Sequence, residues 1–228
     1  MKKILIVALV AFSLHSFAQK GLHLGVMGGP QFTAQLNKQD SDDPNVRFEG
    51  ITMRSAFGII ANYHFTDKVG VGTQFLFSYQ GMKYENLAGV EFFRKVNYLK
   101  LPILLHVNSS PDKVVGGYFY IGPQFSFQIG NDAEINGVSQ KGTLFYPVYD
   151  DIHKGVTIGA AMGFGMLFNA MDGKLQPHFG LRLDGDFTSV YDDEKATIVL
   201  SSYGANSRGA TRNVNGLIEF GIKYVLFN

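Results

Sequence analysis

Residues 178–187 read HFGLRLDGDF, a segment in which apolar and polar positions alternate. Alternation with a period of two over this length predicts a β-strand with two chemically different faces. A charged face in outside water would indicate a soluble barrel or sandwich, whereas an apolar face in lipid would put the charges inside a membrane barrel. The apolar face carries Phe179, Leu181, Leu183 and Phe187, and the polar face carries His178, Arg182, Asp184 and Asp186.

The same alternation recurs along the chain and predicts eight strands. Each predicted strand reaches the roughly 9–11 residues that a β-strand needs to cross a bilayer. The predicted strands are residues 21–32, 52–65, 69–84, 93–107, 117–129, 154–169, 175–189 and 213–227.

The connections between these strands alternate in length. Residues 66–68, 108–116 and 170–174 form short connections, whereas 33–51, 130–153 and 190–212 are long and 85–92 is intermediate. Short turns at one end and long loops at the other are typical of outer-membrane barrels. The fold class we predict is all-β: an eight-stranded antiparallel up-and-down transmembrane β-barrel with short periplasmic turns and longer extracellular loops.

Two features favour lipid over water outside this barrel. The polar face is rich in glycine, which suits a crowded interior where larger side chains need room. Aromatic residues of the apolar face gather near strand ends, as Tyr63, Tyr79 and Tyr224 do, where a membrane-interface girdle would place them. The alternative is a secreted soluble barrel, similar to a lipocalin, that binds an apolar ligand.

The N-terminus predicts export. Lys2 and Lys3 precede an apolar run over residues 4–14 and a small-residue cleavage site before Gln19, so residues 1–18 are expected to be a signal peptide and residues 19–228 an outer-membrane barrel domain. Removal of the two lysines leaves 18 basic and 19 acidic residues, a net charge of about −1. This charge does not favour nucleic acid as a partner. The chain has no cysteine, which excludes disulfides, thiolate metal sites and lipidation at the cleavage point.

Charged residues at inward positions predict a polar network in the lumen. An eight-stranded barrel encloses a space that side chains can fill, and charges within it are expected to pair. We therefore predict a filled lumen without an open channel, and a structural role for the network. Pro102 and Pro123 each lose a ladder hydrogen bond, so a bulge or a bend is expected there. The predicted network consists of Arg54, Lys100, Arg182, Asp184, Asp186, Glu219 and Lys223.

Catalytic, cofactor and metal sites are not predicted. A lipid-modifying enzyme would need a histidine beside a serine and a carboxylate. The candidates for such a site are His64, His106 and His178 with Ser78 or Ser126 and Asp184, but no segment brings them together at local spacing. We therefore expect a protein that is not an enzyme, and keep an outer-membrane lipid-modifying enzyme as an alternative.

Acidic residues cluster in the loops that are predicted to lie outside the cell. Without a spaced calcium-binding motif, solvated loop tips are favoured over Ca²⁺ sites or ion bridges to lipopolysaccharide. Two long loops, with GTLFYPVYDD and ATIVLSSYG, carry apolar residues that could contact a protein partner. Outer-membrane lipid and lipopolysaccharide are the other expected partners. The acidic residues are Asp40, Asp42, Asp43, Asp150, Asp151, Asp192, Asp193 and Glu194.

The segment NYLKLPILL, residues 97–105, resembles a central strand of the PorT-like outer-membrane β-barrel family of Bacteroidetes. The segments GLHLGVMGGPQF, YIGPQFSF and IEFGIKYVLF resemble other strands of that family, although Lys100 stands where an acid is usual. The resemblance implies an eight-stranded barrel in the outer membrane, and its founding member is associated with protein secretion. We therefore expect a non-enzymatic barrel with a structural or partner-binding role, as an accessory to secretion or surface assembly.

Overall fold

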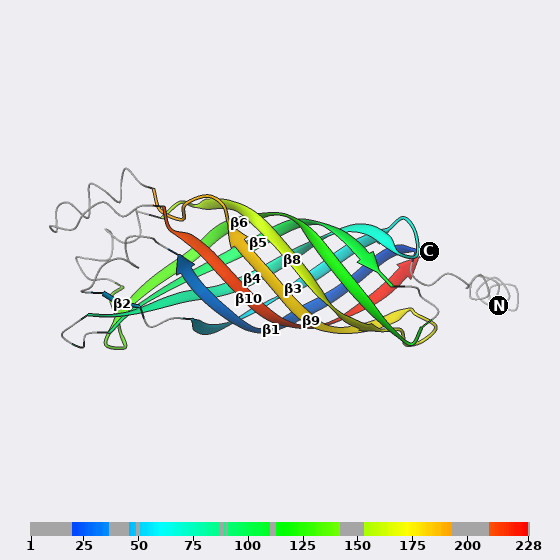
Figure 1. Ribbon diagram of the computed structural model, residues 1–228, viewed down its shortest axis with the longest axis horizontal. Coiled ribbons are helices and arrows are strands. Elements are labelled where there is room, and N and C mark those ends of the chain that lie inside the picture. Colours follow the sequence, from blue (N-terminus) through cyan, green and yellow to red (C-terminus); the bar gives the residue numbers. More distant parts are fainter. Residues whose placement is uncertain are drawn as a thin grey trace, which may run out of the picture.

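The computed structural model describes residues 20–36, 46–48, 51–86, 89, 91–109, 113–141, 153–192 and 210–227. Eight long strands form a closed antiparallel barrel whose long axis is horizontal in Figure 1. The described part of the chain contains no helix that is long and apolar enough to cross a membrane. The long strands are β1 (Gly21–Leu36), β3 (Thr52–His64), β4 (Val69–Asn86), β5 (Glu91–Asn108), β6 (Val115–Ile135), β8 (Val156–Phe168), β9 (Leu175–Asp186) and β10 (Arg212–Phe227).

The barrel closes between its first and last long strands. β1 pairs with β10, and the remaining neighbours follow as β9, β8, β6, β5, β4 and β3, which returns to β1. The start of β1 and the end of β10 lie beside the end of β3, at the end of the barrel where the short connections run (Figure 1). The eight-stranded antiparallel fold predicted from alternation is therefore confirmed.

Several strands extend beyond their predicted ends on the long-loop side. β1 continues to Leu36 and β6 to Ile135, where it turns back into β7 (Val138–Ser139), so the segments predicted as loops from residues 33 and 130 begin as strand. The short strand β2 (Val46–Phe48) pairs with the end of β4. The signal peptide predicted for residues 1–18 lies outside the described residues.

Of the bulge or bend expected at the prolines of β5 and β6, the bulge does not form. The register of these two strands is the same on both sides of Pro102 and Pro123, and it shifts instead between Asn97 and Tyr98. The hydroxyl of Thr73 donates to the Pro102 carbonyl at 2.8 Å, so a polar contact forms beside the proline. A missing N–H removes a ladder bond without requiring an extra residue in either strand.

The two faces of every long strand differ as the alternation predicts. In β9, Leu181 and Leu183 are 44% and 52% exposed, whereas Arg182 is 0% exposed and Asp184 is buried. The outward positions next to this strand are also apolar, because Leu181 lies between Phe164 of β8 and Ile218 of β10. An exposed apolar belt around a buried polar interior is the arrangement of a transmembrane barrel and the reverse of a soluble one. The opening segment therefore turns its charges into the lumen.

Candidate functional site

Arg182 spans the lumen at the middle of the barrel. Its Nη1 donates to Gln74 Oε1 on β4 and its Nη2 to Gln124 Oε1 on β6, both at 2.5 Å. Three strands separate β9 from β4 in either direction around the barrel, so these strands lie on opposite walls. Eight strands leave a lumen narrow enough for one arginine to bridge, and this side chain therefore blocks the interior.

Asp184 balances the charge of Arg182 and also joins three further strands, one of them β6, whose Gln124 amide donates to it at 3.4 Å. It accepts from Arg182 Nε at 3.1 Å and forms a second salt bridge with Lys100 of β5. Asn215 of β10 donates to the same carboxylate at 3.0 Å. Buried charges that are paired and hydrogen-bonded avoid the large cost of an isolated ion. One residue further along the same face, Asp186 accepts from Asn213 at 2.9 Å.

Glu219 of β10 is the centre of a second group, nearer to the short-turn end. The hydroxyls of Tyr118 and Tyr120 donate to its two oxygens at 3.1 and 2.5 Å, and His178 Nε2 lies 3.3 Å from Oε1. Lys223 lies above the Tyr118 ring, with its Nζ 5.7 Å from the ring centroid. These tyrosines come from β6, so the contacts cross the lumen between β6 and β10.

Inward-facing glycines make room for these tyrosine side chains. A Cβ added at Gly163 would lie 2.2 Å from Tyr120 Cζ, and one at Gly180 would lie 2.3 Å from the Tyr118 hydroxyl. Both distances are far below a permitted contact, so any larger residue at Gly163 of β8 or Gly180 of β9 would displace the rings. The glycine-rich polar face noted in the sequence is therefore explained by the bulk of its neighbours.

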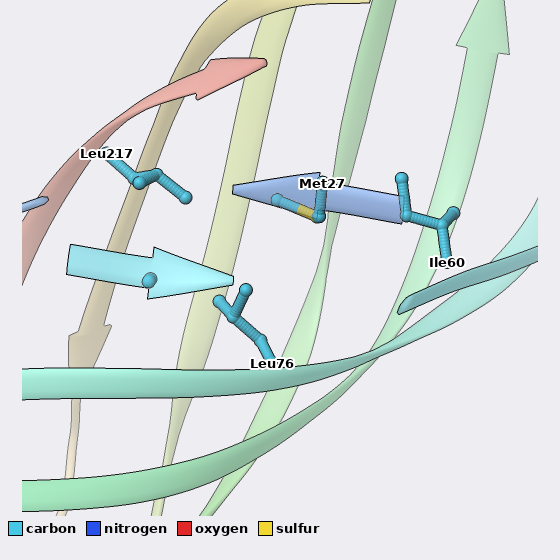
Figure 2. Close-up of a cluster of buried hydrophobic side chains, with 5 residues drawn as sticks. Met27, Ile60, Leu76 and Leu217 are labelled. Carbon is cyan, nitrogen blue, oxygen red and sulfur yellow. The ribbon is translucent and has the colours of Figure 1, made fainter. Parts of the chain in front are cut away.

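Apolar side chains also enter the lumen, which the sequence analysis did not predict. Met27, Ile60, Leu76 and Leu217 point toward one another from four strands and form a buried cluster with Ala56 (Figure 2). A second cluster combines Leu104, Ala161 and Leu167 with Tyr118 and Tyr120. These residues occupy the same inward positions as the polar residues. Alternation in the sequence could therefore have predicted that they face the lumen. Together with the charged groups, they fill the interior with side chains.

The candidate catalytic residues form contacts other than a histidine–serine pair. His64 Nε2 lies 3.1 Å from the Asn108 amide, and His178 Nε2 contacts Glu219. Ser78 donates to Gln31 at 2.9 Å and accepts from Gln80 at 3.0 Å. The hydroxyl of Ser126 accepts from Gln124 at 3.5 Å. The His64 ring is tilted against that of His23 and lies edge-on to that of His106, so the histidines gather with one another at the short-turn end.

The structure brings six of the seven predicted network residues into the buried interior. We call these six residues the lumen cluster. Arg54 does not join it, because its guanidinium carbon lies 5.7 Å from the centroid of the Phe93 ring near the long-loop end of the barrel. Within the described ranges, His, Asp and Glu form no group of three that could hold a metal ion. The lumen cluster consists of Lys100, Arg182, Asp184, Asp186, Glu219 and Lys223.

Of the acidic loop residues predicted to face outward, only Asp192 lies within the described residues. The others, and the apolar loop segments GTLFYPVYDD and ATIVLSSYG, lie outside them.

Comparison with known proteins places the architecture in context. The family described as "Outer membrane protein beta-barrel domain" matches residues 17–191. No curated protein matches the chain. Among solved structures, the outer membrane protein OprG from Pseudomonas aeruginosa is 12% identical, with a TM-score of 0.53 over 92% of this chain and 100% of that one. Outer Membrane Protein W from E. coli is 13% identical, with a TM-score of 0.48 over 91% of this chain and 99% of that one. At such identity the similarity to OprG concerns the fold alone.

Proposed function

The chain belongs to the outer membrane protein beta-barrel domain family, and we propose that it is a non-enzymatic barrel of the outer membrane that acts by structure and partner binding. One observation carries the first part of this proposal: Arg182 hydrogen-bonds to the opposite wall of the lumen, through Gln74 of β4. A barrel of this width with its centre occupied by paired charges offers no continuous water path. Its contacts with other molecules then fall to its outer surface and its loops.

Conductance across a planar bilayer tests the filled lumen. The full-length mature barrel should give no steady channel current, because the lumen cluster and the two apolar clusters occupy the interior. A larger barrel of the porin type is the positive control. Steady conductance of the porin kind from this chain would contradict the proposal.

A role as an accessory to secretion or surface assembly is the finer part of the proposal. The resemblance of residues 97–105 to the PorT-like family supports this role, and so do the long loops with their apolar segments. Chemical cross-linking in native outer membranes, followed by purification of the full chain, tests it. A stoichiometric envelope protein partner is expected, and a chain that is recovered only with itself would refute the accessory role.

The proposal that the protein is not an enzyme rests on the contacts of the candidate nucleophiles. The Ser78 hydroxyl is engaged by Gln31 and Gln80, and His178 is engaged by Glu219, so neither is poised for proton transfer to the other. Incubation of the folded barrel with phospholipid and lipid A vesicles tests this point. Deacylated or acyl-transferred lipid that disappears in a His178→Ala variant would show the alternative to be right.

Export by a signal peptide completes the proposal. Cleavage before Gln19 is expected from the basic residues, the apolar run and the small-residue site at the N-terminus. Mass determination of the chain from purified outer membranes should show that it begins at Gln19. A chain that retains Met1 would refute the cleavage.

A further inference from the structure

Three cations surround the Phe93 ring of β5 at the long-loop end of the barrel; Phe93, Lys83 and Lys95 occupy outward positions, and Arg54 approaches the ring from an inward position of β3. The guanidinium carbon of Arg54 and the Nζ atoms of Lys83 and Lys95 lie 5.7, 5.8 and 5.1 Å from the centroid of the Phe93 ring. The ring covers the outer side of β4, because a Cβ added at Gly81 would lie 2.7 Å from Phe93 Cε2. We call these three residues the rim cations.

Two of the rim cations have no salt bridge among the described residues. Lys95 forms a salt bridge with Glu134, whereas the described residues give neither Arg54 nor Lys83 a carboxylate partner. The Nε of Arg54 is buried and has no hydrogen-bond partner there. Asp132, which pairs with Lys95 in the β5–β6 ladder, accepts from the Ser139 hydroxyl at 2.9 Å and keeps its negative charge. Within the described part of the chain, Arg54 and Lys83 therefore have no direct carboxylate partner, and the Arg54 Nε is an unmatched donor, although Glu91, Asp132 and Glu134 share the face with Lys83 and Lys95.

An open notch lies next to these cations, where β3 separates from β4. The pairing of these strands ends at Ala56 and Ser78, although β3 begins at Thr52 and β4 continues to Asn86. Beyond that point the Thr33 hydroxyl of β1 donates to the Gly81 carbonyl at 2.8 Å. The notch has a volume of about 390 Å³, which exceeds that of a single phosphate. It is lined by Met53, Arg54, Ser55 and Tyr79.

The position of the rim cations along the strands matches the headgroup level of a bilayer. In the outward rows across β4, β5 and β6, Phe77, Leu99 and Phe127 form an apolar row. Lys83, which pairs with Phe93, lies three outward positions beyond Phe77 along β4, toward the long loops. At about 3.4 Å per residue, six residues of β4 separate the two rows by roughly 20 Å along a tilted strand. The apolar row then faces acyl chains, and Lys83 lies at the level of the lipid phosphates.

The geometry points to a binding site for the phosphate-bearing headgroup of an outer-leaflet lipid, held between Arg54 and Lys83, with an acyl chain against Met53 and Tyr79 in the notch. Arginine offers a fork of donors that fits phosphate oxygens, and lysine adds a point charge. The inference needs the long loops to face outward, and it is independent of the role proposed for the lumen.

Lipid retention by the folded full-length barrel tests this site. Native mass spectrometry would follow binding of lipid A with both phosphates to the detergent-refolded protein. The double variant Arg54→Gln/Lys83→Gln should bind about 30-fold more weakly, and each single variant about fivefold, because each cation near an anionic surface contributes about 1 kcal/mol. Lys68→Gln/Lys113→Gln removes the same charge at the short-turn end and should leave affinity within about twofold.

Further arms of the experiment identify the source of the phosphate. Dephosphorylated lipid A should be retained no better by the native chain than by the double variant. Millimolar inorganic phosphate should not displace the lipid, because it lacks the acyl chain. A gel shift between folded and boiled samples confirms that each variant folds; if the double variant does not fold, the single variants decide. Equal lipid retention by native and variant chains would overturn the site, and so would equal retention of dephosphorylated lipid. Displacement by phosphate alone would overturn the lipid as its ligand.

Discussion

Replacement of Leu181 by arginine should destabilise the barrel strongly, because this side chain lies on the lipid face near mid-membrane. Leu181 is 44% exposed, is central in β9, and has Phe164 and Ile218 as its outward neighbours. A cation at that depth loses its hydration without gaining a partner. The expected loss is about 2–4 kcal/mol in the free energy of unfolding, which urea titration in lipid vesicles would measure.

Leu226→Arg is a matched control for this variant. Leu226 is 47% exposed and also faces outward, but it lies near the end of β10, where an arginine side chain can reach the interface. Its substitution should cost only about 0–1 kcal/mol. Equal costs at the two positions would refute the membrane reasoning. Ready labelling of Leu181→Cys by a water-soluble thiol reagent in vesicles would also refute it.

Two further variants probe the filled lumen by the same urea titration. Gly163→Ala should cost about 1–3 kcal/mol, because the new methyl overlaps a fixed tyrosine ring, whereas Gly117→Ala should stay within about 0.5 kcal/mol, since its nearest atom lies at 3.8 Å. Arg182→Met should cost about 3–5 kcal/mol, as expected when a buried charge network is broken. Adding Asp184→Asn should not restore stability, because that change leaves Lys100 without its salt-bridge partner; recovery in the double variant would contradict the pairing.

Alternation in the sequence was sufficient to predict the barrel and most of the inward charges. A period of two assigns a residue to a face, and the lumen cluster follows from that assignment for residues such as Lys100 and Glu219. Alternation gives neither depth nor the distance between opposite walls. The bridge from Arg182 to Gln74 depends on which strands face each other across the lumen, and this becomes visible only when the barrel closes.

Arg54 shows where this reasoning fails. Its position in β3 is inward and β1 still pairs it with Gln31, but the ladder between β3 and β4 stops at Ala56, and the guanidinium reaches the Phe93 ring past the edge left by β4. The inward apolar residues were missed for a different reason. Met27 and Leu76 occupy inward positions like their polar neighbours, and only the packed interior shows that the adjacent strands β10, β1, β3 and β4 form an apolar cluster there (Figure 2).

The distribution of the lumen cluster along the chain has a consequence for biogenesis. Of its six members only Lys100 precedes residue 175, while β9 and β10 carry the other five. A nascent sheet that ends at β8 therefore holds Gln74 and Gln124 without their guanidinium partner, and one cation without its counter-ion. The lumen cluster becomes electrically neutral only when β9 and β10 are in place. A chain truncated before β9 would therefore leave buried polar groups and one cation unpaired, so the stability of the lumen depends on the last two strands.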